Sequence, residues 1–213
     1  GLAGCGVLGG SGSEEPEPEP LTGTFGPATG PDSWRRSLGG PATLEPEGAL
    51  YVLSGRSDEG DAPRPDRSTL TRVSSDGTEA WRVDVEVATG GLRATDGAVY
   101  HFRAEAPTDR VPDRVSARDP GTGDHRWTRA VGSHPTFVGT TAEAVFVGET
   151  NDDPARLPVR ALEAPSGERR WQRETPMPQG GVVSHGLCLV DGYPDRVVAL
   201  STDDGTVRWT DRL

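Results

Sequence analysis

The 213-residue sequence contains no lysine, no isoleucine, only two cysteines and one methionine, and it is 32% hydrophobic. No apolar run approaches the roughly 18 residues of a membrane-spanning helix. No long window places apolar residues at the spacing of an amphipathic helix. Cys5 and Cys188 are too few and too far apart in sequence for a disulfide framework or a Cys-x-x-Cys site. These absences argue against a membrane-helix protein, a helical bundle and a cysteine-built metal centre.

The basic side chains are arginine and four histidines, and 33 acidic residues outnumber 22 arginines to give a net charge of −11. This balance argues against a nucleic-acid partner, which requires a basic face. Part of the acidity lies in one run, Glu14, Glu15, Glu17 and Glu19. The acidity has two possible explanations: it adds solubility in high salt, or the chain is an ordinary acidic extracytoplasmic protein.

The first residues contain a candidate lipidation motif. Leu2-Ala3-Gly4-Cys5 resembles the lipobox of prokaryotic lipoproteins, whose cysteine is lipidated after the signal peptide is removed. The resemblance implies that residues 1–4 are a signal-peptide remnant and that Cys5 carries the lipid. Residues 5–29 are rich in Gly, Ser, Glu and Pro and predict an extended, solvated tether. The alternative is a small buried cysteine in an unstructured leader.

Glycine and tryptophan form a repeat. The 29 glycines and 19 prolines favour short strands joined by turns. Each tryptophan has a glycine four residues before it, and the tryptophans recur every 38 to 47 residues, at Trp34, Trp81, Trp127, Trp171 and Trp209. A period near 40–45 residues is typical of a four-stranded propeller blade. Between tryptophans, the chain divides into four short β-rich segments, which we denote A to D in chain order.

The glycines have a predicted local role. Gly77, Gly123, Gly167 and Gly205 fall in the hairpin between segments C and D, where a positive φ angle is needed. Each tryptophan then falls at a fixed position on strand D, between neighbouring blades. Small residues before the turn, such as Ala117 and Ala161, leave room for an indole.

The later repeats resemble the tryptophan-docking motif A-x-D-x-x-T-G-x-x-x-W of the PQQ-like (quinoprotein) β-propellers. Residues 117–127 match it fully, 161–171 closely and 199–209 loosely. The turn before Trp81 is one residue shorter, and Trp34 keeps only the glycine spacing. The resemblance covers residues 30–213. It implies an all-β propeller of four-stranded antiparallel blades, with the five tryptophans docking between blades.

Within that family the chain looks similar to lipid-anchored propellers like the outer-membrane assembly scaffold BamB, which bind proteins. The quinoprotein dehydrogenases hold their quinone over a vicinal disulfide, with a calcium-type ion and an aspartate base, and this chain has no Cys-Cys pair. We therefore expect a non-enzymatic scaffold on the outer side of the cytoplasmic membrane or the cell surface, binding other extracytoplasmic or membrane proteins. A fragment of a PQQ-dependent dehydrogenase and an extracytoplasmic small-ligand or glycan sensor are the alternatives.

Candidate site residues follow from this architecture. No catalytic, cofactor-binding or metal-ligating residue is predicted, although His134 and His185 are predicted in innermost A strands, where a shared site would be possible. The B–C loops are rich in aspartate and arginine, and loops on a rigid scaffold often carry recognition. The candidate interaction residues are Asp58, Arg64, Asp109, Arg110, Asp152, Asp153, Arg156, Asp195 and Arg196.

Blade counting predicts incomplete closure. Trp34 marks an outer strand without its own A–C strands, and four complete blades follow it. The sequence therefore predicts four blades plus one extra outer strand, as part of a seven- or eight-bladed ring that continues beyond Leu213. An open arc would expose apolar blade faces at both ends and favour self-association. The alternative is a four-bladed chain that dimerises into an eight-bladed ring.

Overall fold

A computed structural model describes residues 42–44, 49–55, 67–86, 88–103, 113–149 and 157–212. These residues form sixteen strands in four separate four-stranded antiparallel sheets. No helix within these ranges could span a membrane. The predicted lipid anchor, the tether and Trp34 lie outside the described residues. So do the predicted interaction residues of the first three B–C loops, Asp58, Arg64, Asp109, Arg110, Asp152, Asp153 and Arg156.

Each sheet is one blade made of four consecutive strands. Blade 1 contains β1 (Ala42–Leu44), β2 (Leu50–Gly55), β3 (Arg67–Val73) and β4 (Glu79–Glu86). Blade 2 contains β5 (Ala88–Ala94), β6 (Val99–Arg103), β7 (Asp113–Arg118) and β8 (His125–Gly132). Blade 3 contains β9 (Pro135–Thr140), β10 (Ala144–Glu149), β11 (Leu157–Glu163) and β12 (Arg169–Thr175). Blade 4 contains β13 (Pro178–Ser184), β14 (Leu187–Gly192), β15 (Arg196–Ser201) and β16 (Val207–Arg212).

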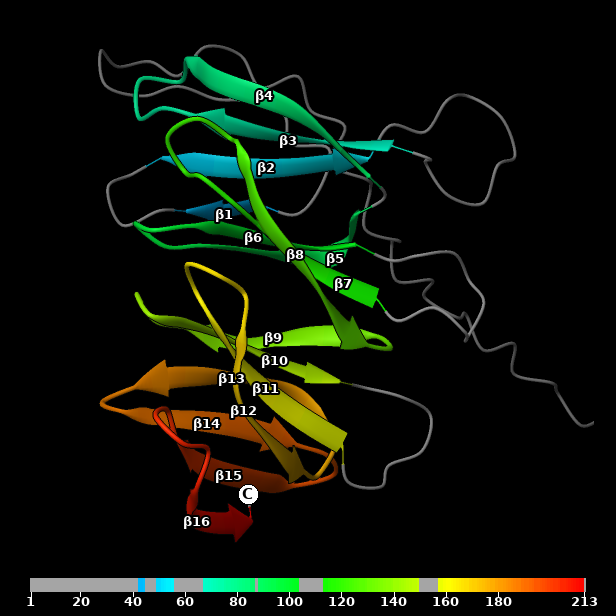
Figure 1. Cartoon of the computed structure of the whole chain (residues 1–213), viewed down its shortest axis with the longest axis vertical. Coiled ribbons are helices and arrows are strands. Elements are labelled where there is room, and N and C mark those ends of the chain that lie inside the picture. Colours follow the sequence, from blue (N-terminus) through cyan, green and yellow to red (C-terminus); the bar gives the residue numbers. More distant parts are fainter. Residues whose placement is uncertain are drawn as a thin grey trace, which may run out of the picture.

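The blades follow one another in chain order and do not close into a ring. The first strands of neighbouring blades contact each other, β1 with β5, β5 with β9 and β9 with β13. The fourth strands form the outer edges of the sheets. Figure 1 shows the four sheets arranged along the long axis, with blade 1 and blade 4 at opposite ends. The predicted all-β, open propeller of four-stranded blades is therefore confirmed.

The hydrophobic core is divided into layers between adjacent blades. Alternate residues of each strand face opposite neighbours, because successive side chains in a strand point to opposite faces. In β10, Val145 and Val147 belong to the cluster between blades 2 and 3, whereas Phe146 belongs to the cluster between blades 3 and 4. A third cluster, around Tyr51 and Leu70, lies between blades 1 and 2. A middle strand such as β10 is therefore buried on both faces.

The exposed apolar surface is concentrated in blade 4. The large hydrophobic side chains most exposed among the described residues are Val182 (55%), Val207 (49%), Tyr193 (46%) and Trp209 (44%). At the other end, Val52 and Val73 of blade 1 are only 7% and 0% exposed. The expectation of exposed apolar faces at both ends is therefore wrong for the described part of blade 1. Those side chains are covered there, whereas the outgoing face of blade 4 is open.

One histidine lies deep in the layer between blades. His101 of β6 is 3% exposed, and neither ring nitrogen has a hydrogen-bond partner within the described residues. Burial, helped by the nearby Arg118 guanidinium, lowers the pKa of His101 from 6.5 to about 4. The imidazole is therefore neutral in the folded protein at neutral pH.

This buried histidine makes stability depend on acid. Between about pH 6.5 and 4 the unfolded chain binds a proton at His101 that the folded chain does not. The free energy of unfolding should therefore decrease as the pH is lowered from about 6.5 to 4. The contribution lost should be roughly 3 kcal/mol. Urea unfolding at pH 7 and pH 4 should show a smaller loss for His101→Leu than for the parent. Equal losses would exclude His101 as the source.

Candidate functional site

Three tryptophans join each blade to the next through a repeated contact. Trp127 and Trp171 are 5% and 8% exposed. The indole Nε1 of each tryptophan donates to a carbonyl in the C–D hairpin of the following blade. The three bonds are Trp81 to Pro120 (3.0 Å), Trp127 to Ala164 (2.8 Å) and Trp171 to Thr202 (2.9 Å). This hydrogen bond satisfies the one polar atom of the indole, whose remaining surface makes apolar contacts.

The hairpin glycines serve two purposes. Gly123, Gly167 and Gly205 have φ angles of 77°, 68° and 68°, which a residue with a Cβ rarely adopts. A Cβ at Gly167 would also lie 2.6 Å from the ring of Trp127. The same relation holds for Gly123 beneath Trp81 and for Gly205 beneath Trp171. Glycine is therefore required both by the turn and by the indole of the preceding blade.

The hairpins differ in length as the sequence indicates. In blade 2 the amide of Gly123 donates to the Asp119 carbonyl, whereas in blade 1 the amide of Gly77 donates to the Ser74 carbonyl, one residue nearer. The motif aspartate organises the longer turn. Its Oδ1 accepts from the amides of Gly121 and Thr122 at 2.8 and 3.0 Å. The hydrogen bond from the Arg126 guanidinium holds the pKa of Asp119 below its usual range, and the hydrogen bonds from these two amides contribute a smaller lowering.

A second aromatic ring, which was not among the predicted residues, packs beside each docked indole. Tyr51, Tyr100 and Phe146, at the same position of successive B strands, lie 5.7 to 5.9 Å from the tryptophan of their own blade, measured between ring centroids. In blade 4 this position holds Cys188, which is fully buried and free. Burial raises the pKa of the Cys188 thiol to about 12, so it is an inert core residue.

The B–C loops and the connections between blades share one face of the molecule. The Tyr193 amide in the β14–β15 turn donates to the Met177 carbonyl between blades 3 and 4, at 2.9 Å. Between blades 2 and 3, the His134 amide donates to Asp113 Oδ2 at 2.9 Å, where β7 begins. The connections between blades 2 and 3 and between blades 3 and 4 are thus both bonded to the root of a B–C loop. We refer to this surface as the loop face.

An ion pair anchors the loop face between blades 2 and 3. Arg160 Nη1 lies 2.8 Å from Glu149 Oε2, both side chains are less than 20% exposed, and the same nitrogen donates to the Val131 carbonyl. Glu149 Oε1 accepts from the Ser133 amide at 3.2 Å. The carboxylate fills the space that a Cβ at Gly132 would occupy, 1.7 Å from Oε1. These contacts therefore tie the end of β10, where the B–C loop of blade 3 begins, to the connection between blades 2 and 3.

Two of the predicted interaction residues lie within the described chain. Asp195 is exposed in the Tyr193–Asp195 turn, and the half-buried Arg196 begins β15 opposite Arg212 of β16. The turn is shorter than the loop 191–196 that the sequence predicts, because Asp191 and Gly192 still belong to β14 and Arg196 begins β15. Both residues lie on the loop face beside exposed Tyr193.

The histidine prediction is wrong. His134 and His185 precede and follow the inner strands β9 and β13 respectively, in turns where their φ angles are 46° and 50°. Thr136 lies beside Gln179 near the start of the two strands, and Gly139 lies beside Val183 near their ends. The strands therefore run in the same direction, and the two histidines lie at opposite ends of them. Among the described residues, no group of three histidine, cysteine, aspartate or glutamate side chains could hold a metal ion.

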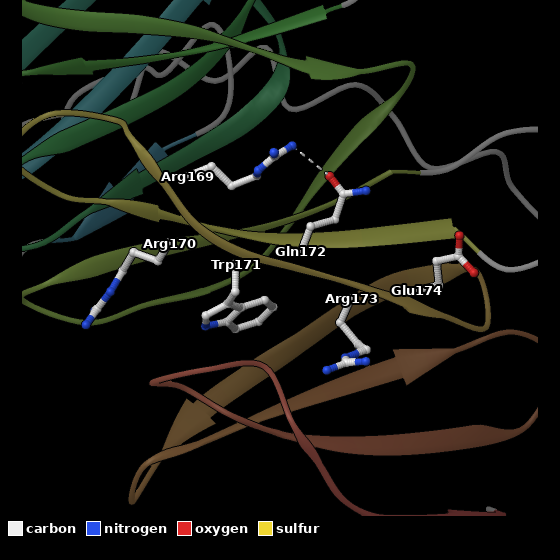
Figure 2. Close-up of a pocket in the computed structure, with 6 residues that line it drawn as sticks. All are labelled: Arg169, Arg170, Trp171, Gln172, Arg173 and Glu174. Atoms are coloured by element: carbon white, nitrogen blue, oxygen red, sulfur yellow. Dashed lines mark hydrogen bonds between the residues drawn. The ribbon is translucent and has the colours of Figure 1, made fainter.

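An open depression of about 690 Å³ lies along the outer strand β12. Six consecutive residues line it: Arg169, Arg170, Trp171, Gln172, Arg173 and Glu174 (Figure 2). Arg169 Nη1 donates to Gln172 Oε1 at 3.2 Å, and Arg173 Nε donates to the Gly205 carbonyl of blade 4 at 2.9 Å. The depression is thus basic and belongs to the outer rim rather than to the loop face.

Comparisons with known proteins agree on the architecture. The family described as outer membrane protein assembly factor BamB matches residues 23–185 and 155–213. No curated protein sequence matches the chain. The structure resembles BamB from Moraxella catarrhalis with 19% identity and a TM-score of 0.57, covering 84% of this chain and 50% of that one.

Quinohemoprotein alcohol dehydrogenases have the same blade arrangement. The enzyme from Pseudomonas putida HK5 gives a TM-score of 0.54 at 15% identity, over 84% of this chain and 35% of that one. The enzyme from Comamonas testosteroni gives 0.56 at 15% identity, over 83% and 35%. The chain therefore spans half the length of the BamB structure and about a third of each dehydrogenase. From its blades, its docked tryptophans and the family match over most of its length, the chain belongs to the BamB family of PQQ-like β-propeller repeat proteins.

Proposed function

We propose that this chain is a lipid-anchored, extracytoplasmic scaffold that binds other envelope proteins through its loop face and catalyses no reaction. The family match to a membrane-protein assembly factor supports the scaffold role. The observation that carries the proposal is the loop face, where two inter-blade connections are hydrogen-bonded to the roots of loops at Asp113, Glu149 and Tyr193. A surface whose loop roots are hydrogen-bonded to neighbouring blades suits recognition, because less ordering entropy is lost on binding.

The anchor gives the first test. Full-length protein with its signal peptide, made in a bacterial host that lipidates envelope proteins, should fractionate with membranes because Cys5 follows Leu2-Ala3-Gly4. Cys5→Ser should move most of it to the soluble fraction, since one signal for membrane attachment is removed. Cys188→Ser serves as the control and should leave the distribution unchanged. A membrane-bound Cys5→Ser protein would contradict lipid anchoring at Cys5.

The loop face gives the second test. A photo-crosslinking amino acid at Asp195, which is exposed beside Tyr193, should capture discrete envelope proteins in cells. The same amino acid at Glu143, exposed in the β9–β10 turn at the opposite ends of the strands, is the matched control. Partners captured equally at both positions, or at neither, would contradict the role of the loop face.

The dehydrogenase fragment remains the second candidate, because the dehydrogenase structures share the fold. The chain's own residues do not fit the quinone as these enzymes hold it. The vicinal disulfide has no counterpart, since Cys5 and Cys188 are not adjacent and Cys188 is a buried free thiol. Titration with pyrroloquinoline quinone and Ca²⁺ should therefore give no saturable change in the quinone absorption band, whereas saturation at one equivalent would favour the enzyme.

A further inference from the structure

The charges of this acidic chain are segregated on the outer rim. The outer strands of blades 2 to 4 hold seven arginines, Arg126, Arg129, Arg169, Arg170, Arg173, Arg208 and Arg212, but only two carboxylates, Glu174 and Asp211. The outer strand of blade 1 has the opposite composition, with Arg82 alone among Glu79, Asp84 and Glu86. A chain with a net charge of −11 therefore carries a basic rim over three of its four blades.

The arginines of β12 differ from those that serve the fold. Arg82, Arg126 and Arg160 each form an ion pair with a carboxylate, at 2.6 to 2.8 Å. Arg169, Arg170 and Arg173 have no carboxylate within 4.0 Å in the described part of the chain, and all three are exposed. Arg169 and Arg173 are held in place by single hydrogen bonds to Gln172 and to Gly205, which leave most of their N–H donors available.

The backbone of β12 is also available. β12 pairs with β11 along one edge, and no described strand pairs with the other. An exposed strand edge presents unpaired N–H and C=O groups that can accept an added strand. Trp171 and Arg173 face blade 4, whereas Arg169 lies with Gln172 on the other face, because the pairing register shifts opposite Arg170 (Figure 2). Charged donors therefore flank both faces of that edge.

We propose that β12 and its arginines form a docking edge for an extended, acidic segment of a partner protein. The added strand would pair with the free edge of β12, and its carboxylates would receive charge-assisted hydrogen bonds from Arg169, Arg170 and Arg173. Arg169 and Arg173 lie on opposite faces of the edge, so carboxylates on either face of an added strand would meet a guanidinium. The docking of this segment rests on the proposed scaffold function and specifies the chemistry of one partner.

A polypeptide fits this surface better than a polyanion does. Long-range repulsion by a net charge of −11 opposes nucleic acid and anionic membranes, whereas a short segment experiences chiefly the local arginines within a Debye length. The unpaired edge offers backbone partners that only a peptide can use fully. Arginine is also suited to bidentate recognition of a carboxylate.

The test uses the full chain and three labelled probes. The first is a seven-residue peptide alternating valine with glutamate, the second has its central valine replaced by proline, and the third has lysine in place of glutamate. The alternating peptide should bind, as measured by fluorescence anisotropy, and binding should weaken as salt rises from about 0.05 to about 0.5 M. The proline peptide should bind several-fold more weakly, since it cannot complete the strand ladder, and the lysine peptide should not bind.

Matched variants locate the site. Arg169→Gln/Arg170→Gln/Arg173→Gln should weaken binding at least about tenfold, which corresponds to the loss of several charge-assisted contacts. Arg170→Gln alone removes a side chain with no hydrogen bond in the described structure, and should weaken binding by about threefold without disturbing the fold. Arg82→Gln makes the same charge change on the outer strand of blade 1 and should have no effect.

Several results would overturn the docking edge. Absence of peptide binding would do so, as would equal weakening by Arg170→Gln and Arg82→Gln, or equal binding of the proline peptide. Tighter binding of anionic vesicles or of a single-stranded oligonucleotide than of the peptide, abolished by the triple substitution, would assign the arginines to another ligand. Crosslinking from Asp195 is independent of β12, so its persistence would separate failure of this edge from failure of the scaffold function.

Discussion

Replacing Trp171 with alanine should lower the free energy of unfolding by about 3–5 kcal/mol, whereas the same change at Trp209 should cost about 1 kcal/mol. The two residues occupy the same position of successive repeats. Trp171 is 8% exposed and donates to the Thr202 carbonyl, while Trp209 is 44% exposed. Removing Trp171 therefore opens a cavity between blades 3 and 4 and leaves a hairpin carbonyl without its donor, and removing Trp209 does neither.

Urea unfolding followed by far-ultraviolet circular dichroism measures both changes. Trp209→Ala is the matched control, because it removes the same side chain from the same place on an outer strand. Similar losses for Trp171→Ala and Trp209→Ala would mean that the cost comes from the strand itself. The contact with the next blade would then contribute little.

Alanine at Gly167 should cost about 3 kcal/mol or more, and alanine at Gly186 about 1 kcal/mol. Both glycines have a positive φ angle, 68° and 74°, so the backbone penalty is similar. A Cβ at Gly167 would lie 2.6 Å from the Trp127 ring, whereas a Cβ at Gly186 would have no neighbour within 4 Å. The difference in the free energy of unfolding between the two variants therefore measures the effect of the close approach of the indole, separately from the strain of the turn.

The readouts for this pair are the urea midpoint and the tryptophan emission. Gly167→Ala should shift the emission to longer wavelength, because displacing the Trp127 ring admits water to the layer between blades 2 and 3. Gly186→Ala should leave the emission unchanged. Equal destabilisation by both substitutions, with no spectral change, would show that turn strain alone accounts for the glycine.

The repeat signal in the sequence was strong because each blade reuses one local solution. A glycine-containing hairpin, with Asp-x-x-Thr-Gly in blade 2 and variants of it elsewhere, is followed four residues after the glycine by a tryptophan at a fixed place on the outer strand. Aromatic residues at Tyr51, Tyr100 and Phe146 were also visible in phase with the tryptophans and could have been found by aligning the repeats. The carbonyls that accept the indole hydrogen bonds carried no signal, because Pro120, Ala164 and Thr202 use only their backbone oxygens.

Other features required the packing of the blades. The arginines beside Trp127, Trp171 and Trp209 are plain in the sequence, but only the sheet order places them together on an outer rim with a free edge. The histidines were misplaced because His134 and His185 adopt positive φ angles in turns, where strand periodicity gives no information.

The all-β class, the blade period, the hairpin glycines and the tryptophan positions could be predicted from the sequence alone, because the hairpin and the outer strand form through contacts within about ten residues of chain. Which face of each blade is covered depends on how neighbouring blades pack. Trp171 and Trp209 have the same local sequence pattern, yet one is buried and the other exposed, since burial depends on whether a neighbouring hairpin lies against the indole. That neighbour comes from a different repeat, more than thirty residues away in sequence.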